Sequence, residues 1–312
     1  MFVALAGGVG AAKLLAGLAG VVDPSEITAV VNTGDDLVLH GLHISPDIDS
    51  VTYALAGLDN KTTGWGVADE TWTVAANLKA LGGVSWFQLG DRDLATHLFR
   101  TERLSHGVAL SQVTAELAAA RGVGARLVPM SDDPVRTRVT LADPPAGEEA
   151  EVAFQDYFVR LGHDVAVASV RFDGAELARP APGELEAIDT AELVMCCPSN
   201  PIVSIGPILA VPGIRAALTA RRDTVVAVSP IVAGAALKGP ADRLLRELGH
   251  ESSALGVARL YAPWVGTLVI DEADAELVGD IEALGMRCVV APTVMSDGHR
   301  AADLAKAVLS AV

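Results

Sequence analysis

The stretch MFVALAGGVGAAKLLAGL, residues 1–18, decides the fold. A short apolar run is followed by a cluster of glycines and then by residues that favour a helix. We therefore predict a strand over residues 2–6, a glycine turn and a helix over residues 11–18. Residues 26–36, EITAVVNTGDD, supply a second β-branched run that ends in Asn-Thr-Gly. This order of strand, turn, helix and strand favours a parallel sheet with helices on both faces.

Short apolar runs that end in a turn occur again late in the chain. They are AELVMCC (191–197), DTVVAVS (223–229), GTLVIDE (266–272) and MRCVVAP (286–292). The middle of the chain differs: residues 71–80 and 110–120 favour helices, and short strand-like runs follow them. We predict one domain with a three-layer, Rossmann-like α/β core from about residues 1–38 and 184–312. The segment 39–183 is predicted to be an α+β insertion. In such sheets, ligands bind at the carboxyl ends of the strands.

Composition narrows the class of protein. The 312 residues are 51% hydrophobic and carry a formal net charge of −16. This charge opposes binding to nucleic acid or to an anionic membrane, and no apolar stretch approaches the roughly 20 residues that cross a bilayer. We expect neither partner. Three cysteines form no disulfide framework, and the apolar start reads as a strand rather than a signal peptide, which favours the reducing cytoplasm.

The glycine turn has two readings. Gly8 and Gly10 let backbone N–H groups approach an anion at the start of the helix, with Lys13 nearby. The alternative is a tight strand-to-helix turn with no ligand. Lys13 stands where a dinucleotide fingerprint has its third glycine, and the Gly-Lys-Ser/Thr ending of a P-loop is absent from the sequence.

A second motif gathers carboxylates. Residues 32–50, NTGDDLVLHGLHISPDIDS, contain Asp35, Asp36, Asp47 and Asp49 on one short span. Clustered carboxylates repel one another, so they are either exposed to solvent or hold a hard cation such as Mg²⁺.

Three further predicted loops carry polar side chains that could contact a ligand. Arg92 stands between two aspartates in FQLGDRDLATH, after a strand-like segment, as a salt-bridged residue or a ligand contact. Ser199 and Asn200 follow an apolar strand and would contact a base or phosphate, or cap a helix. Lys238 is a candidate phosphate partner or a solvated surface lysine. Together these motifs suggest a parallel-sheet protein that holds a phosphorylated nucleotide with a divalent cation.

The order of these motifs resembles the 2-phospho-L-lactate transferase family of coenzyme F-420 biosynthesis. The resemblance rests on GGVGAAKLLAGL, VNTGDD, SPDIDS, GWGVADETW, LGDRDLATHL, LSQVT, MSDDPV, FQDYFVR, PSNPIVSIGPIL, VSPIVAGAALKGPA and GVARLYA. It runs from the first strand to about Tyr261. The chain is most similar to the actinobacterial branch, which is associated with phosphoenolpyruvate transfer.

This resemblance implies a magnesium-dependent enzyme of the cytoplasm and a homodimer. The enzyme would transfer a phosphoenolpyruvyl group from enolpyruvyl-diphospho-5'-guanosine to 7,8-didemethyl-8-hydroxy-5-deazariboflavin, giving dehydro coenzyme F-420-0 and GMP. The inserted region would bind the deazaflavin acceptor.

The resemblance also implies roles for single residues. Asp49 and Arg92 would contact the acceptor, and Asp49 would orient the attacking hydroxyl. Asp35, Asp36 and Asp49 would form the metal region. The guanosine diphosphate site would include Gly8, Gly10, Lys13, Ser199, Asn200 and Lys238. We expect Asp49→Ala to abolish transfer and to leave the fold intact.

Other readings remain open. The donor could carry a lactyl group in place of the enolpyruvyl group, and proteins of similar core bind nucleotide sugars as regulators without catalysis. A nicotinamide-dependent oxidoreductase is a third class, suggested by the glycine turn alone. It is weakened by Lys13 and by the Asn-Thr-Gly ending of the second strand, where an acidic contact to ribose is expected.

Overall fold

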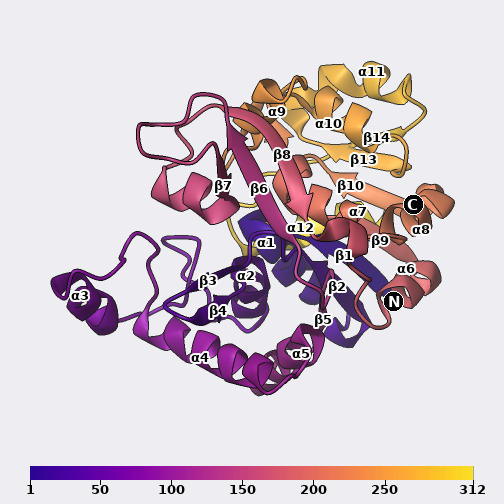
Figure 1. The fold of residues 1–312 in the computed structure, drawn as a ribbon. Coiled ribbons are helices and arrows are strands. Elements are labelled where there is room, and N and C mark those ends of the chain that lie inside the picture. Colours follow the sequence, from indigo (N-terminus) through magenta and orange to yellow (C-terminus); the bar gives the residue numbers. More distant parts are fainter. Residues whose placement is uncertain (312) are drawn as a thin grey trace.

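The computed structural model describes residues 1–311. Within this range, parallel strands form a central sheet in the order β14-β13-β10-β9-β1-β2-β5 (Figure 1). Their bounds are β1 Phe2–Ala6, β2 Ile27–Val31, β5 Arg126–Pro129, β9 Leu193–Cys196, β10 Val225–Val228, β13 Thr267–Ile270 and β14 Arg287–Val290. The late apolar runs of the sequence are thus confirmed as strands of the same sheet as the first strand.

Alternation along β1 divides the core into two layers. Val3 and Leu5 pack into one hydrophobic cluster, and Ala4 and Ala6 pack into the other, because successive side chains of a strand point to opposite faces. One face is covered by α1 (Gly8–Ala19), α2 (Pro46–Leu55), α5 (Leu110–Ala120) and α12 (Gly298–Leu309). The other is covered by α6 (Glu184–Thr190), α7 (Gly206–Ala210), α8 (Ile214–Ala220), α10 (Ala254–Tyr261) and α11 (Val278–Glu282). The three-layer α/β fold predicted from the sequence is confirmed.

The middle of the chain adds smaller units around this core. They are the hairpin β3 (Leu37–Leu39) and β4 (Leu42–Ile44), the helices α3 (Thr73–Ala80) and α4 (Asp91–Ser105), and an antiparallel sheet of β6 (Arg136–Leu141), β7 (Glu151–Ala153) and β8 (Val167–Asp173). A π-helical turn, Asp156–Arg160, follows β7. Helix α9 (Ala241–Glu247) follows the short hairpin of β11 (Ile231–Val232) and β12 (Ala235–Ala236).

Two sequence expectations differ from the structure. The segment 39–183 is not one continuous insertion, because β5 lies inside it and pairs with β2 at the edge of the central sheet. The sequence shows residues 126–129 as a strand-like run, but only the pairing of β5 with β2 reveals that this run belongs to the central sheet. The strand-like residues before Arg92 form no strand in the described chain, and α4 begins directly after them.

The topology marks a place for a ligand. From β1 the chain builds the sheet outward through β2 and β5, and β9 later pairs with the other edge of β1 and starts the opposite half. The strand order therefore reverses between β1 and β9. Crevices at the carboxyl ends of strands beside such a reversal are the usual binding sites of open α/β sheets.

Candidate active site

A cavity of about 700 Å³ lies at this reversal. Its floor is formed by Gly7–Gly10 after β1, by residues after β9 and by three carboxylates. The residues after β9 are Pro198–Asn200, Val203 and Ser204, and the carboxylates are Asp35, Asp47 and Asp49. The size is that of a cleft for a small molecule or cofactor. The sequence motifs that were far apart in the chain thus meet at one place.

The glycine turn is held by a carboxylate and a hydroxyl. Gly8 has a φ of +71°, and its N–H donates to Asp47 Oδ1 at 2.7 Å. The N–H of Gly7 donates to Ser199 Oγ at 3.2 Å. A Cβ on Gly10 would lie 2.4 Å from the carbonyl oxygen of Pro198, so glycine is needed for α1 to approach the loop after β9.

Asp35 and Asp47 form a buried pair of carboxylates. The amide nitrogen Nδ2 of Asn32 donates to both, at 3.3 Å to Asp35 and 2.9 Å to Asp47, and Gln155 Nε2 donates to Asp35 at 3.2 Å. Burial and the negative charges of Asp47 and Asp36 raise the pKa of Asp35 well above its usual value. Burial raises the pKa of Asp47 to about 6, against hydrogen bonds from Asn32 and Gly8. The direct hydrogen-bond donors of this pair are uncharged.

Asp36 is partly buried and does not line the cavity in the described chain. Its side chain accepts a hydrogen bond from Ser45 Oγ at 2.8 Å, and Oδ1 has no hydrogen-bond partner among the described residues. Burial raises its pKa to about 7, although Arg136, the bond from Ser45 and Arg100 oppose the shift. The cavity-lining residues found within 1–311 do not include Asp36.

Buried carboxylates of this kind fit a hard divalent cation. Carboxylate oxygens are the ligands that Mg²⁺ prefers, and a cation would offset the repulsion between Asp35 and Asp47 that their hydrogen bonds leave in place. The carboxylates that line the cavity are Asp35, Asp47, Asp49 and Asp93, whereas the metal region suggested from the sequence was Asp35, Asp36 and Asp49.

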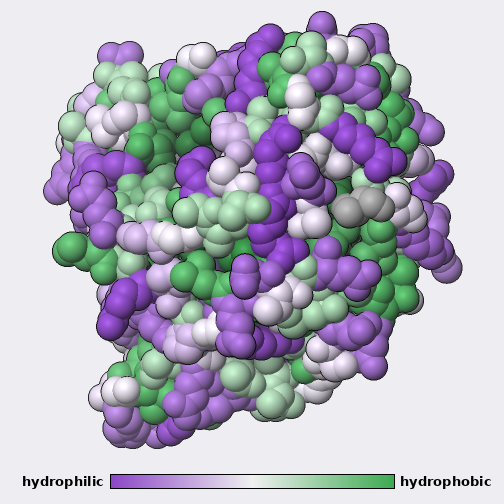
Figure 2. Space-filling view, turned by 90° about the vertical axis from the view of Figure 1, so that its right-hand side faces the viewer, coloured by the Kyte–Doolittle hydropathy of each residue, from purple (hydrophilic) through white to green (hydrophobic). Residues whose placement is uncertain are grey.

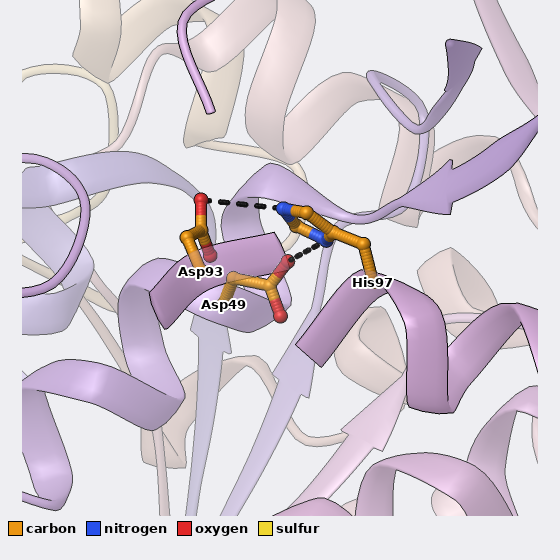
Figure 3. Close-up of side chains that lie close together, drawn as sticks. All are labelled: Asp49, Asp93 and His97. Carbon is orange, nitrogen blue, oxygen red and sulfur yellow. Dashed lines mark ion pairs between the residues drawn. The ribbon is translucent and has the colours of Figure 1, made fainter. Parts of the chain in front are cut away.

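Asp49 has a permanent cationic partner. The guanidinium of Arg100, which is 0% exposed, pairs through Nη2 with Oδ1 of Asp49 and through Nη1 with Oδ2 at 3.1 Å. The imidazole of His97 lies between two carboxylates (Figure 3): Nδ1 is 3.7 Å from Asp49 Oδ2, and Nε2 is 3.2 Å from Asp93 Oδ2. Tyr53 Oη donates to Asp93 Oδ1 at 2.5 Å. This cluster joins α2 to α4.

The charges in the cluster partly balance. Burial alone would raise the pKa of Asp93, but the hydrogen bond and charge of His97 and the hydrogen bond from Tyr53 outweigh it and keep the pKa below its usual value. Burial disfavours a charged Arg100, and Asp49 more than compensates, so the pKa of Arg100 is raised. A carboxylate, a guanidinium and an imidazole are therefore fixed in one buried cluster, in which Asp49 and His97 line the cavity and Arg100 lies outside its lining in the described chain.

The sequence analysis did not single out Asp93, His97 or Arg100. Their spacing of i, i+4 and i+7 places them on one face of α4, which is the signal that could have found them. Asp47 was noticed in the acidic run but not chosen as a ligand. Its importance comes from the hydrogen bond to Gly8, 39 residues away, which the sequence does not reveal.

The remaining candidates are spread around the site. Arg92 is exposed, donates through Nη1 to the carbonyl of Ala68 at 2.6 Å, and is not among the lining residues within 1–311. Lys13 is likewise outside the lining of the described chain, and its Nζ donates to the carbonyl of Met295 at 3.0 Å. Burial and the charges of Lys238 and Lys61 lower the pKa of Lys13.

The corner after β9 and Lys238 do line the cavity. Asn200 accepts hydrogen bonds from the N–H groups of Ile202 and Val203 at 2.9 and 3.3 Å, so its side-chain oxygen caps the following helical turn. Ser199 is buried and accepts the N–H of Gly7. The structure thus confirms the capping reading for Asn200 and brings both residues beside the glycine turn.

Aromatic side chains also line the cavity, and no sequence pattern had indicated them. We define the aromatic wall as Trp65, Trp86, Phe87, Phe154 and Phe158. Phe154 and Phe158 stack at 5.5 Å between ring centroids, and Trp86 and Phe87 meet edge to face at 5.7 Å. Such a wall suits a flat aromatic ligand.

Figure 2 shows hydrophilic and hydrophobic residues interspersed over the face that it displays. Among the described residues, no single helix has the length and apolar character to cross a membrane. One pair, Pro201–Ala210 and Ile214–Ala220, meets both criteria together but is bent by 94°.

Comparisons with known proteins find relatives that match nearly the whole chain. The chain is 47% identical over 311 residues to a phosphoenolpyruvate transferase of Kitasatospora aureofaciens, with 99% of this chain and 96% of the relative covered. It is 47% identical to the one of Streptomyces griseus (98% and 96% covered) and 41% identical to that of Mycolicibacterium smegmatis (97% and 96% covered).

A solved structure shares the fold. It is a member of the UPF0052 family from Bacillus halodurans, with a TM-score of 0.61, 17% identity and 99% and 98% of the two chains covered. The family model described as 2-phospho-L-lactate transferase CofD matches residues 2–293. The chain, from its glycine turn to its last sheet strand, therefore belongs to the 2-phospho-L-lactate transferase CofD family.

Proposed function

We propose that this protein transfers a phosphoenolpyruvyl group from enolpyruvyl-diphospho-5'-guanosine to 7,8-didemethyl-8-hydroxy-5-deazariboflavin, with release of GMP. Its relatives at 46–47% identity over nearly the whole chain are named phosphoenolpyruvate transferases. The observation that carries the proposal is a cavity with two unlike halves, a floor of carboxylates and glycines and a wall of aromatic rings. A charged nucleotide donor fits the first half, and a tricyclic acceptor fits the second.

The donor lies over the glycine turn in this proposal. Gly8, Gly10, Ser199, Asn200 and Lys238 surround its diphosphate, and Lys238 supplies positive charge at the rim of the cavity. Lys13 contributes charge from outside the lining. The first turn of α1 presents backbone N–H groups there, which favours an anion.

The acceptor lies between the aromatic wall and Asp49. A hydroxyl of its ribityl chain attacks the phosphorus that carries the enolpyruvyl group. A new P–O bond forms, the bond between this phosphorus and the GMP oxygen breaks, GMP leaves, and the proton of the hydroxyl is released to solvent. Asp49 orients this hydroxyl by accepting its hydrogen bond, because Arg100 fixes the carboxylate and leaves further lone pairs free. Arg92 is a second acceptor contact in the proposal, although its guanidinium would have to leave Ala68. Positioning and electrostatics carry most of the barrier lowering in such transfers.

Magnesium is part of the proposal. Asp35 and Asp47 would hold it with Asp49 nearby, and Asp36 would act from behind them. When bound, the ion supplies positive charge against the phosphoryl oxygens of an otherwise acidic site. We also propose that the protein works in the cytoplasm as a homodimer, as the family resemblance implies.

A transfer assay tests the reaction. Purified protein receives the deazaflavin acceptor and MgCl₂ with either the enolpyruvyl or the lactyl donor, and products are identified by mass; reactions with EDTA or without acceptor are the controls. We expect the phosphoenolpyruvyl product and GMP in equal amounts, only with the metal present. A phospholactyl product alone would correct the donor. If neither donor reacts while a nucleotide sugar binds, the protein is a regulator and the proposal fails.

A further inference from the structure

Residues 61–90, which we call the aromatic arm, carry three of the five wall residues, and only Val67, Leu89 and Gly90 of this segment are buried. The arm contains α3, and none of the eight residues of this helix is buried. Figure 1 places α3 at the edge of the molecule, joined by extended loops. Trp65, Trp86 and Phe87 flank α3 and line the cavity. An arm without a core of its own needs another device to hold these rings in place.

Two carboxylates provide that device at the start of α4. Asp91 accepts hydrogen bonds from the N–H groups of Thr73 and Val74, both at 3.0 Å, and from Thr71 Oγ1 at 2.7 Å. It thereby caps the amino end of α3, although it belongs to α4. The hydrogen bonds from Thr71, Val74 and Thr73 lower the pKa of Asp91.

Glu70 makes the reverse connection. Its two carboxylate oxygens accept the N–H groups of Arg92 and Asp93, at 3.0 and 2.9 Å, and so cap the amino end of α4 from the arm. Gly90 makes room for this contact, since a Cβ there would lie 2.0 Å from Glu70 Oε2. Each helix is therefore capped by a carboxylate of the other segment, and both caps lie at the helix ends where negative charge is favoured.

We propose that Glu70 and Asp91 form a reciprocal clasp that positions the aromatic arm over the cavity and so sets its affinity for the aromatic acceptor. The second half rests on the proposed function. The same clasp fixes the start of α4, which carries Asp93 and His97 at the cavity wall. Glu70 and Asp91 are positioning residues, because neither lines the cavity in the described chain.

Two variants test the clasp in different ways. Glu70→Gln removes its charge and one acceptor oxygen. Gly90→Ala keeps every polar group and displaces Glu70 only through the volume of the added methyl group. The φ of Gly90 is −76°, which alanine adopts without strain. Matched controls are Glu102→Gln, on the exposed side of α4, and Gly279→Ala, where an added Cβ meets nothing within 4 Å.

Hydrogen exchange of the ligand-free protein measures the clasp directly. We expect the amides of Thr73, Val74, Arg92 and Asp93 to exchange about tenfold faster in both variants, as the loss of helix caps predicts. The controls should leave these amides unchanged. Unchanged exchange in both clasp variants would show that the clasp does not hold the arm, and the proposal would be wrong.

Kinetics of the full enzyme measure the consequence. We expect the KM for the acceptor to rise about tenfold in the clasp variants, with the KM for the donor and kcat within about twofold of the parent values. Faster exchange with an unchanged acceptor KM would overturn the link to affinity. An equal rise in both KM values, with a lower melting temperature, would indicate a merely structural role and would also overturn it.

Tryptophan fluorescence separates this test from the proposed function. Three of the four tryptophans lie in the arm, at Trp65, Trp72 and Trp86, while Trp264 is fully buried in the core. Titration of the unmodified protein with the deazaflavin should quench the arm emission. If the deazaflavin neither binds nor reacts, the proposed function fails, and the exchange experiment still decides the clasp.

Discussion

The floor of the cavity and the aromatic arm are built in opposite ways. The floor lies on the central sheet and on α1 and α2, and its carboxylates Asp35, Asp47 and Asp49 are each at most 6% exposed. The aromatic arm has no buried helix residue in the described chain and is held by polar caps. Phosphoryl transfer needs charges held in fixed positions, whereas a large planar ligand can bring its own contact area. The difference indicates that the core fixes the chemistry and that local contacts fix the acceptor site.

The largest expected effect follows from removing the ion pair between Asp49 and Arg100. Asp49→Ala should abolish transfer and lower the free energy of unfolding by about 3–5 kcal/mol, because it leaves the fully buried Arg100 without its partner. The expectation from the sequence was an intact fold, and the buried arginine changes that part. Urea denaturation is the measurement, with Asp303→Ala, in an exposed pair with Lys306, as the control. An unchanged midpoint would contradict the prediction.

A second change weakens the floor without removing its shape. Asp47→Asn keeps an oxygen for the Gly8 N–H but loses the negative charge, and we expect kcat to fall about a hundredfold. The rise in melting temperature with MgCl₂ should shrink as well, if Asp47 holds the ion. Steady-state kinetics and thermal shift are measured beside Asp143→Asn, a change in an exposed loop. Parent-like values of both quantities would remove Asp47 from the proposed site.

Glu184 is a buried carboxylate that does not line the cavity in the described chain, so it tests the effect of burial apart from any role in transfer. Burial raises the pKa of Glu184 to about 8, above its ordinary value of 4.5. Between these values the folded protein holds a proton that the unfolded chain releases, so stability falls as pH rises, by about 1.4 kcal/mol per pH unit. Glu184→Gln should reduce the slope of stability against pH by this amount and leave transfer unaffected. Melting curves from pH 5 to 9 measure it, and an identical slope in the variant would show that Glu184 titrates normally.

The smallest expected effect lies on the arm. Leu81, directly after α3, is 85% exposed, so Leu81→Ser should change the free energy of unfolding by less than about 0.5 kcal/mol and leave both KM values unchanged. Chemical denaturation and light scattering are the measurements. A large destabilisation, or a change of mass in solution, would mean that this surface is covered by a second copy of the chain.

Sequence reasoning reached the fold because its decisive elements are local. The apolar run before Gly7 and the β-branched run before Asn32 each carry their own strand signal, and both became neighbours in the sheet. β5 was misplaced because only its pairing with β2, almost a hundred residues earlier in the chain, reveals its role.

The site was only partly accessible for the same reason. The acidic run identified the floor, but which carboxylates face the cavity depends on the turn at Gly8 and on the burial of Asp36. Arg100 and His97 gain their meaning from Asp49, about fifty residues away. The aromatic wall gathers side chains from segments near residues 65, 86 and 154, and no sequence pattern links them.

At the end of β9, two neighbouring cysteines lie on opposite faces of the sheet. Cys196 at its end packs into one helical layer, and the adjacent Cys197 packs into the other. Both are buried free thiols, and they face away from each other. Alkylation by a small reagent can therefore reach each thiol only when the layer above it opens. Peptide mapping of the modified protein would report two opening rates from neighbouring residues, and their ratio would tell which side of the sheet loosens first.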